Sequence, residues 1–363
     1  MKPTFMPSLF SPLTIRSVTF KNRIGVSPMC QYSSDDGFAN DWHLVHLGSR
    51  AVGGAGLVLT EAAAISPEGR ISPADLGIWK DEHVPMLKRI TEFIEAQGSV
   101  PGIQLAHAGR KSSTEVSWKG GNPINEEQGG WRPIAPSALP FKAGHQVPIE
   151  MDHAAILKVI ADFKAAAVRA FKGGFKVIEL HAAHGYLLNE FLSPASNNRS
   201  DGYGGNFENR VKLLLEVIVA VRSVWPGDLP LFVRISATDY SDNGWTLENS
   251  VALAHILEGV GVDLLDCSSG GNIANVHIPL SPGYQVKFSE QIKKESKILT
   301  AAVGLITDVH QADEIITSGK ADMVFLAREF IRDPYFPLQA SWKLGVDLPW
   351  PAQYERGKPK KAT

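Results

Sequence analysis

The chain has 363 residues, of which 44% are hydrophobic and 20% are charged, an ordinary composition for a globular protein. Its formal net charge of −2 gives no electrostatic reason to expect nucleic acid or an anionic membrane as a partner. Two cysteines are too few for a disulfide framework or for an iron–sulfur cluster held by four thiolates.

The first residues, MKPTFMPSLFSPL, have prolines at positions 3, 7 and 12 and no continuous apolar stretch, unlike a secretory signal. No window approaches the roughly 18 uninterrupted apolar residues of a membrane span. We therefore expect a soluble protein in the reducing cytoplasm.

Apolar runs of strand length alternate along the chain with longer stretches of helical period, as is typical of a parallel sheet wrapped by helices. A short alternating segment, Leu13–Phe20, comes first and predicts a hairpin that closes a barrel floor. Eight strands are predicted after it: Ile24–Ser27, Leu57–Glu61, Gly102–Ala106, Val177–His181, Leu231–Ile235, Asp263–Cys267, Ile298–Ala302 and Met323–Leu326.

The predicted helices lie between these strands and show apolar residues at spacings of three and four. They include Glu82–Gln97, Ala154–Lys172, Phe207–Val224, Leu247–Glu258 and Val309–Ser318. Because α/β barrels often exceed about 200 residues as one unit, residues 1–363 are predicted to form a single (β/α)8 TIM barrel of the α/β class.

The longest irregular stretch, about His107–Pro148, follows the third predicted strand. A loop of that length in a compact domain is usually functional, as a lid or a subunit contact. In barrels, the loops that follow the strands carry the active site.

A glycine run and a histidine pair superficially suggest a dinucleotide-binding loop and a metal site. The run Gly53–Gly56 precedes a strand, whereas a dinucleotide-binding glycine loop follows a strand and opens a helix. The pair His181 and His184 lacks the glutamate of the H-E-x-x-H metal motif and has no third ligand at a telling spacing, so we expect no metal site.

Polar residues at the strand ends suit a flavin mononucleotide (FMN). Gly304 and Arg328 follow the last two strands, where barrels commonly bind phosphate. The amide of Gln104 can pair with the pyrimidine edge of the ring, and Arg234 can stabilise the negative charge of reduced flavin.

The fourth predicted strand ends in a group suited to a carbonyl substrate. Two imidazoles, His181 and His184, can hold an oxygen that becomes enolate-like, as an oxyanion site does. The phenol of Tyr186, two residues further on, can donate a proton.

From Leu13 to Arg356 the sequence resembles the Old Yellow Enzyme family, in its thermophilic-like bacterial ene-reductase subclass. Cys30, where other subclasses carry Thr, and the ending QYERG at 353–357 mark that subclass. The motifs that carry the resemblance are SPMCQYS at 27–33, LAHAGRK at 105–111, ELHAAHGYLLNEFLSP at 179–194, DGYGG at 201–205 and AREFIRDP at 327–334.

The resemblance implies a role for each matching residue. Cys30 would tune the flavin potential, His181 and His184 would bind the substrate carbonyl, Tyr186 would donate the proton, and Tyr32 would line the pocket. The residues implied to hold FMN are Ser27, Pro28, Met29, Cys30, Ala62, Gln104, Arg234, Gly304, Ala327 and Arg328.

The resemblance also implies a homodimer or homotetramer. Arg356 resembles the arginine that reaches a neighbouring active site and contacts substrate there, and the tail from about residue 346 to 363 would lie at a subunit interface. Two departures stand out: Ala327 replaces the glycine commonly found before the phosphate arginine, and the chain runs six residues past Gly357.

The implied activity is that of an FMN-dependent NAD(P)H oxidoreductase, an ene-reductase. By a ping-pong mechanism it would transfer hydride from NADPH or NADH through FMN to the activated C=C bond of an α,β-unsaturated carbonyl compound, an enone or enal. The alternatives are a flavin-binding redox sensor without turnover and a metal-dependent barrel hydrolase.

Overall fold

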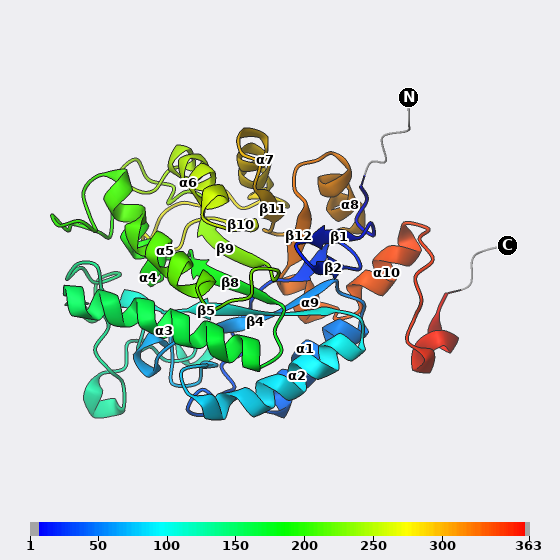
Figure 1. Cartoon of the computed structure of the whole chain (residues 1–363), viewed down its shortest axis with the longest axis horizontal. Coiled ribbons are helices and arrows are strands. Elements are labelled where there is room, and N and C mark those ends of the chain that lie inside the picture. Colours follow the sequence, from blue (N-terminus) through cyan, green and yellow to red (C-terminus); the bar gives the residue numbers. More distant parts are fainter. Residues whose placement is uncertain (1–6, 360–363) are drawn as a thin grey trace.

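The computed structural model of the chain describes residues 7–359. Eight parallel strands close into a barrel wrapped by helices (Figure 1), which confirms the predicted (β/α)8 TIM barrel. The strands are β3 (Ile24–Val26), β4 (Leu57–Ala64), β5 (Val100–Ala106), β8 (Val177–Ala182), β9 (Leu231–Ser236), β10 (Leu264–Ser268), β11 (Leu299–Ala302) and β12 (Met323–Leu326).

All eight predicted strands are present, with small differences at their ends. Neighbours in sequence are neighbours in the barrel, and β12 pairs with β3 to close it. Every side chain of β3, β4, β5, β8, β9, β10 and β12 is buried, since helices cover one face and the barrel interior the other.

The five predicted helices are also present. The helix predicted from Glu82 begins at Val84, because a 3-10 turn, Asp81–His83, comes first. The helices are α1 (Asp41–Val52), α2 (Val84–Ala96), α3 (His153–Lys172), α4 (Leu187–Leu192), α5 (Phe207–Arg222), α6 (Leu247–Gly259), α7 (Val286–Glu295), α8 (Val309–Thr317), α9 (Arg328–Arg332) and α10 (Phe336–Lys343).

Side-chain caps fix where several of these helices start. Asn40, Asp152, Asn206, Thr246 and Asp308 each accept a hydrogen bond from a backbone N–H of the first turn, of α1, α3, α5, α6 and α8 respectively. Such caps satisfy donors that have no partner within the helix.

The predicted hairpin closes the amino-terminal end of the barrel. Strands β1 (Leu13–Ile15) and β2 (Val18–Phe20) pair antiparallel around a turn in which Arg16 has a φ of +53°. Arg16 forms an ion pair with Asp263, next to the start of β10, and the Ser17 N–H donates to the Asp228 carbonyl before β9. The polar strand ends therefore lie at the opposite, carboxyl-terminal face.

The long segment after β5 contains short elements. These are the 3-10 turns η3 (Gly109–Lys111), η4 (Ser117–Lys119) and η5 (Glu126–Gln128), and the two-residue strands β6 (Ile134–Ala135) and β7 (Ile149–Glu150), which pair with each other. The segment belongs to the carboxyl-terminal face because it follows β5.

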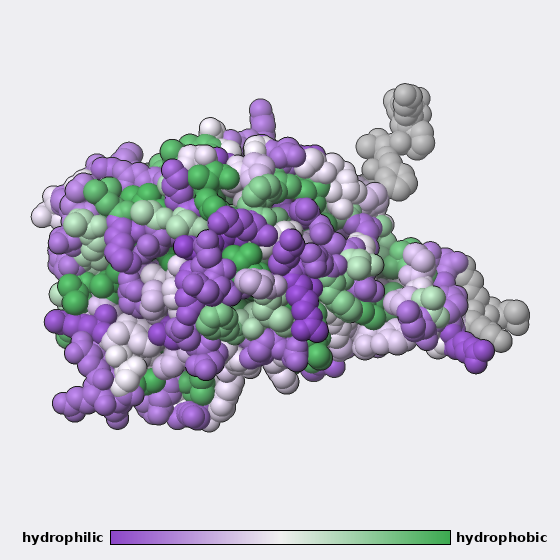
Figure 2. Space-filling view, turned by 60° about the horizontal axis from the view of Figure 1, so that its bottom comes forward, coloured by the Kyte–Doolittle hydropathy of each residue, from purple (hydrophilic) through white to green (hydrophobic). Residues whose placement is uncertain are grey.

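The last described segment lies outside the barrel. After α10 the chain runs to a 3-10 helix, η6 (Ala352–Gly357), at the red end of the ribbon in Figure 1. Figure 2 shows this part as a protrusion from the main body. Residues 360–363 of the predicted interface tail, and residues 1–6 of the amino-terminal segment, lie outside the described residues. Within residues 7–359, no helix has the length and apolar character needed to span a bilayer.

Candidate active site

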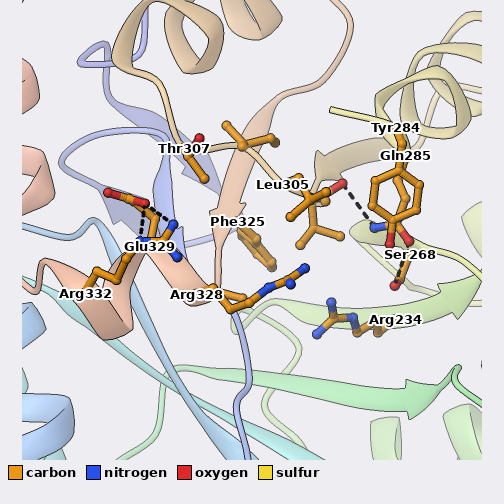
Figure 3. Close-up of a pocket in the computed structure, with 14 residues that line it drawn as sticks. Arg234, Ser268, Tyr284, Gln285, Leu305, Thr307, Phe325, Arg328, Glu329 and Arg332 are labelled. Atoms are coloured by element: carbon orange, nitrogen blue, oxygen red, sulfur yellow. Dashed lines mark hydrogen bonds and ion pairs between the residues drawn. The ribbon is translucent and has the colours of Figure 1, made fainter. Parts of the chain in front are cut away.

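A cavity of about 200 Å³ opens at the carboxyl ends of β9–β12 (Figure 3). Four of the predicted cofactor residues line it, namely Arg234, Gly304, Ala327 and Arg328. They come from three different strand ends, so the barrel brings together residues that are far apart in the sequence.

Two cations share this cavity. The guanidinium groups of Arg234 and Arg328 point into the same space in Figure 3. The side chain of Arg328 has no hydrogen bond or ion pair with any of residues 7–359. Arg328, the cation without an anionic partner, fits the phosphate of a flavin mononucleotide.

The backbone at Gly304 requires glycine. Its φ of +117° favours glycine, and a Cβ there would lie 2.7 Å from Nε2 of Gln285. Ala327 lies directly before α9 with a φ of −108°, so alanine adopts this backbone without entering the left-handed region.

Five buried polar side chains of the barrel contact one another next to this cavity. Arg234 forms a buried ion pair with Asp266, Nε to Oδ2 at 3.1 Å, and its Nη1 donates to Ser27 Oγ at 3.1 Å. Gln104 Nε2 donates to Glu179 Oε1 at 2.8 Å, which leaves the Gln104 carbonyl oxygen as an acceptor. Burying charges is costly unless they are paired, and Asp266 provides that pairing for Arg234.

The protonation of the cluster follows from its burial. Desolvation raises the pKa of Glu179, and the negative charge of Asp266 raises it further, against the smaller opposing effect of Arg234. We therefore assign Glu179 as the neutral acid. Asp266 remains the partner of Arg234, and the group as a whole carries little net charge.

Three aromatic side chains gather at the end of β8. The ring centroids of His181 and His184 are 5.1 Å apart, and those of His181 and Tyr186 are 4.8 Å apart. Burial, then the positive charge of Arg234, holds the pKa of both histidines well below the ordinary value, so both imidazoles are neutral.

Backbone and hydroxyl contacts orient the two imidazoles. The Ala183 N–H donates to Nδ1 of His181 at 3.2 Å, so the ring proton of His181 is on Nε2. Nε2 of His184 lies 2.6 Å from Ser268 Oγ, and the His184 N–H donates to Ser236 Oγ at 2.8 Å. Each ring therefore keeps one nitrogen free of these contacts.

Tyr186 borders a small cavity that also touches Ala62, Asp75 and Ala108. Burial is the main cause that raises the pKa of Tyr186, and the negative forms of Cys30, Tyr32 and Asp75 would raise it further. The phenol therefore keeps its proton at neutral pH.

The segment after β3 forms another side of the site. Ser27 is buried, whereas Pro28, Met29, Cys30 and Tyr32 are half-buried. Burial, followed by the charges of nearby carboxylates, raises the pKa of Cys30, so its sulfur is a neutral thiol. Tyr32 has a φ of +48° and its ring packs edge-on against Trp118 at 5.7 Å between centroids.

Arg356 is not brought to this site. It is exposed on η6, in the protruding carboxyl-terminal part of the chain (Figure 1). The structure thus gathers the other predicted residues around one barrel end and leaves Arg356 apart from them.

Sequence reasoning missed several residues of the site. Ser236 and Ser268 contact His184, but each lies one residue beyond the predicted end of its strand, so neither was considered. Gln285 and Tyr284, which line the cavity, precede α7, a helix for which no prediction was made. Lys111 was part of a quoted motif without a role.

A TIM barrel with two arginines in a cavity at its strand ends, beside a His–His–Tyr group, is the arrangement expected of an FMN-dependent oxidoreductase. Residues 8–345 match the family described as NADH:flavin oxidoreductase / NADH oxidase. The NADPH dehydrogenase of Bacillus subtilis (strain 168) is 47% identical over 351 residues, covering 96% of this chain and 98% of the relative. That of Geobacillus thermodenitrificans (strain NG80-2) is 50% identical over 351 residues, with the same coverage.

Solved structures of two reductases have the same fold as this chain. Morphinone reductase superposes with a TM-score of 0.78 at 28% identity, over 96% of this chain and 92% of that one. A 2-naphthoyl-CoA reductase gives a TM-score of 0.83 at 25% identity over 93% of this chain, which spans about half (52%) of that longer protein. The chain therefore belongs to the NADH:flavin oxidoreductase / NADH oxidase family, that of Old Yellow Enzyme, and is an FMN-dependent NADPH oxidoreductase. The predicted family is confirmed.

Proposed function

We propose that this oxidoreductase is an ene-reductase that reduces the activated C=C bond of α,β-unsaturated carbonyl compounds by a ping-pong mechanism, with NADPH or NADH as donor. The observation that carries the proposal is the group of His181, His184 and Tyr186 beside the arginine-lined cavity. The chemistry that FMN supplies when bound is storage of a hydride between the two half-reactions.

In this proposal the chain holds FMN through two sets of groups. Arg328 and the backbone at Gly304 and Ala327 bind the phosphate, and Gln104 and Arg234 bind the ring. Ser27, Pro28, Met29, Cys30 and Ala62 would complete the ring site, where the neutral Cys30 thiol would tune the potential. The free Gln104 carbonyl oxygen and the exposed Arg328 guanidinium support these roles.

The two imidazoles bind the substrate carbonyl. His181 carries its proton on Nε2 and can donate it to the oxygen. If the Ser268 hydroxyl donates to Nε2 of His184, the proton of that ring is on Nδ1 and is available as a second donor. Neutral donors stabilise a developing enolate without transferring a full proton to it.

Tyr186 supplies the proton to the α-carbon. A phenol is a weak acid in water, with a pKa of about 10, and gains force when the α-carbon becomes carbanion-like during hydride transfer to the β-carbon. Tyr32, whose ring packs against Trp118, lines the substrate pocket in this arrangement.

A second copy of the chain would complete the site. A groove of about 570 Å³ beside Cys30 is lined by the exposed side chains of Trp42, Val45, Trp118 and Ile331. Exposed apolar surface of this kind is typical of an interface. We propose a homodimer or homotetramer in which the tail from about residue 346 carries Arg356 into the neighbouring active site.

Free thiols at Cys30 and Cys267 are consistent with a reducing compartment, and we propose the cytoplasm. We also propose that the barrel works as one FMN-binding unit. Because the chain belongs to an oxidoreductase family, the alternative of a metal-dependent barrel hydrolase is excluded.

The redox-sensor alternative is tested by turnover. The purified, FMN-loaded protein is mixed with NADPH under anaerobic conditions, with and without cyclohexenone. We expect steady NADPH oxidation and formation of cyclohexanone only when the enone is present. A single stoichiometric bleaching of the flavin, unchanged by any enone or maleimide offered, would favour the sensor.

A further inference from the structure

Lys111, to which the sequence analysis gave no role, links two loops of the active site. It ends η3, directly after β5. Its Nζ donates to the carbonyl oxygen of His184, in the loop after β8, and to that of Gly271, in the loop after β10, both at 2.9 Å. One ammonium group therefore holds together backbone from three sectors of the barrel.

The two loops meet too closely for ordinary side chains. His184 has a φ of +60°, rare for a residue other than glycine, and Gly271 has a φ of +89°. A Cβ on Gly271 would lie 2.8 Å from Cα of His184, and a Cβ on Gly185 would lie 2.5 Å from the Gly271 carbonyl oxygen. A strained backbone persists only where its surroundings fix it, and the two Lys111 hydrogen bonds are such a restraint.

The same ammonium lies over two aromatic rings. Nζ of Lys111 is 4.4 Å from the ring centroid of Phe141 and 5.3 Å from that of Tyr186. A cation at this distance from an aromatic ring is attracted to the ring. It stabilises the negatively charged phenolate form of a tyrosine more strongly than the neutral phenol form. Lys111 is thus placed to favour Tyr186 after it has lost its proton.

We propose that Lys111 is a positioning residue for proton donation: it fixes the turn that carries His184 and Tyr186, and its charge stabilises the Tyr186 phenolate. The proposal rests on the proposed function, in which Tyr186 is the acid. The Tyr186 O–H bond breaks, the electron pair of the enolate forms the new C–H bond at the α-carbon, and the phenolate then regains a proton from water.

The charge on Lys111 depends on pH. Burial is the main cause that lowers its pKa, to about 8; the negative charge of Glu190 opposes this, and the positive charges of Arg110 and Lys142 add to it. The ammonium is therefore present at neutral pH and is lost as the pH rises through about 8. The other titratable groups that face it are His145, His181, His184 and Tyr186.

The test uses stopped-flow kinetics of the holoenzyme, with the two half-reactions followed separately across this pH range. The parent enzyme should show a fall in the rate of cyclohexenone reduction as the pH rises through about 8. Lys111→Met should lose about 10-fold or more below that pH, within the contribution of general-acid catalysis, and should show no fall. Flavin reduction by NADPH should change much less.

Two further variants separate charge from packing. Lys111→Arg keeps its charge above pH 8, so its rate should show no fall there. Lys164→Met, an exposed lysine on the outer face of α3 that is not among the charges acting on Lys111, is the matched control and should keep both the rate and the pH profile of the parent.

The proposal is overturned if the parent rate is flat through this pH range, a result that needs no variant to fold. It is also overturned if Lys111→Met slows both half-reactions alike and keeps the fall, because Lys111 would then be a structural residue only. Tyr186→Phe distinguishes failure of the proposed function: if that variant is unimpaired while Lys111→Met is slow, Tyr186 is not the acid.

Discussion

At the scale of single residues, the chemistry of this site depends on groups that burial keeps neutral. Both imidazoles, the Cys30 thiol and the Tyr186 phenol have pKa values shifted by burial toward the uncharged form. Of the charged groups, Arg234 and Asp266 are paired inside the barrel, whereas Arg328 has no anionic partner among residues 7–359. Neutral hydrogen-bond donors suit a reaction in which negative charge develops on the oxygen of an enolate.

The buried Glu179 makes stability depend on pH in a predictable direction. Its pKa in the folded protein is raised above the ordinary value of 4.5, so the unfolded chain loses this proton first as the pH rises. The free energy of unfolding should therefore fall as the pH rises above about 4.5. Glu179→Gln replaces the titrating carboxyl by an amide that is neutral at every pH, and it keeps an oxygen that can accept the hydrogen bond from Gln104. As the pH rises from the unfolded to the folded pKa of Glu179, the free energy of unfolding of the variant should therefore increase relative to that of the parent by about 1.4 kcal/mol for each pH unit.

Urea unfolding of parent and variant, each with FMN in excess and at several pH values, measures this difference. The two should be close below pH 4.5 and diverge above it. The exposed Glu290→Gln should follow the parent throughout. Parallel curves for parent and Glu179→Gln would show that Glu179 is ionised in the folded state.

At the scale of elements, the site is made by the loops that follow the strands. Gly304, after β11, turns the chain so that its backbone faces the cavity, and Gln285 packs against it from the segment before α7. A methyl group at Gly304 would displace Gln285 and crowd the cavity.

Gly304→Ala should therefore weaken FMN binding by about tenfold or more, which corresponds to about 1.4 kcal/mol. Gly319→Ala is the matched control, because Gly319 also has a positive φ, +76°, but nothing lies within 4 Å of its Cβ position. It should lose stability and keep FMN affinity. Quenching of flavin fluorescence on titration measures the FMN affinity of both variants. Equal affinities for Gly304→Ala and the parent would place the phosphate elsewhere.

The elements were predictable because apolar periodicity is a local signal. The strands and five helices follow from it, and the order of polar residues at the strand ends gave most of the site. The contacts of Lys111 with His184 and Gly271 were not predictable, since they depend on how three loops fold back on one another. Ser268 was missed for a simpler reason: its predicted strand ended one residue early.

At the scale of the whole molecule, the protruding carboxyl-terminal part needs an explanation. It carries η6 with the exposed Arg356, outside the barrel (Figure 1). The groove beside Cys30, lined by Trp42, Val45, Trp118 and Ile331, is a surface that such a part of another copy could cover.

We predict that Arg356→Ala raises KM for the enone and leaves FMN bound, because the arginine would act on substrate from a neighbouring copy. Trp42→Glu, in the groove, should reduce the oligomer seen by analytical ultracentrifugation and raise KM in the same way. A parent enzyme that is monomeric at assay concentrations, with full activity, would remove Arg356 from the site.

If this barrel reduces a carbon–carbon double bond with Tyr186 as the acid, stopped-flow measurement should separate the two half-reactions of Tyr186→Phe. Reduction of the flavin by NADPH needs no proton on carbon and should proceed near the parent rate. Reoxidation by cyclohexenone should slow by about 10² to 10⁴-fold, the usual contribution of a positioned general acid. Reoxidation of Tyr186→Phe at the parent rate would show that Tyr186 is not the proton donor.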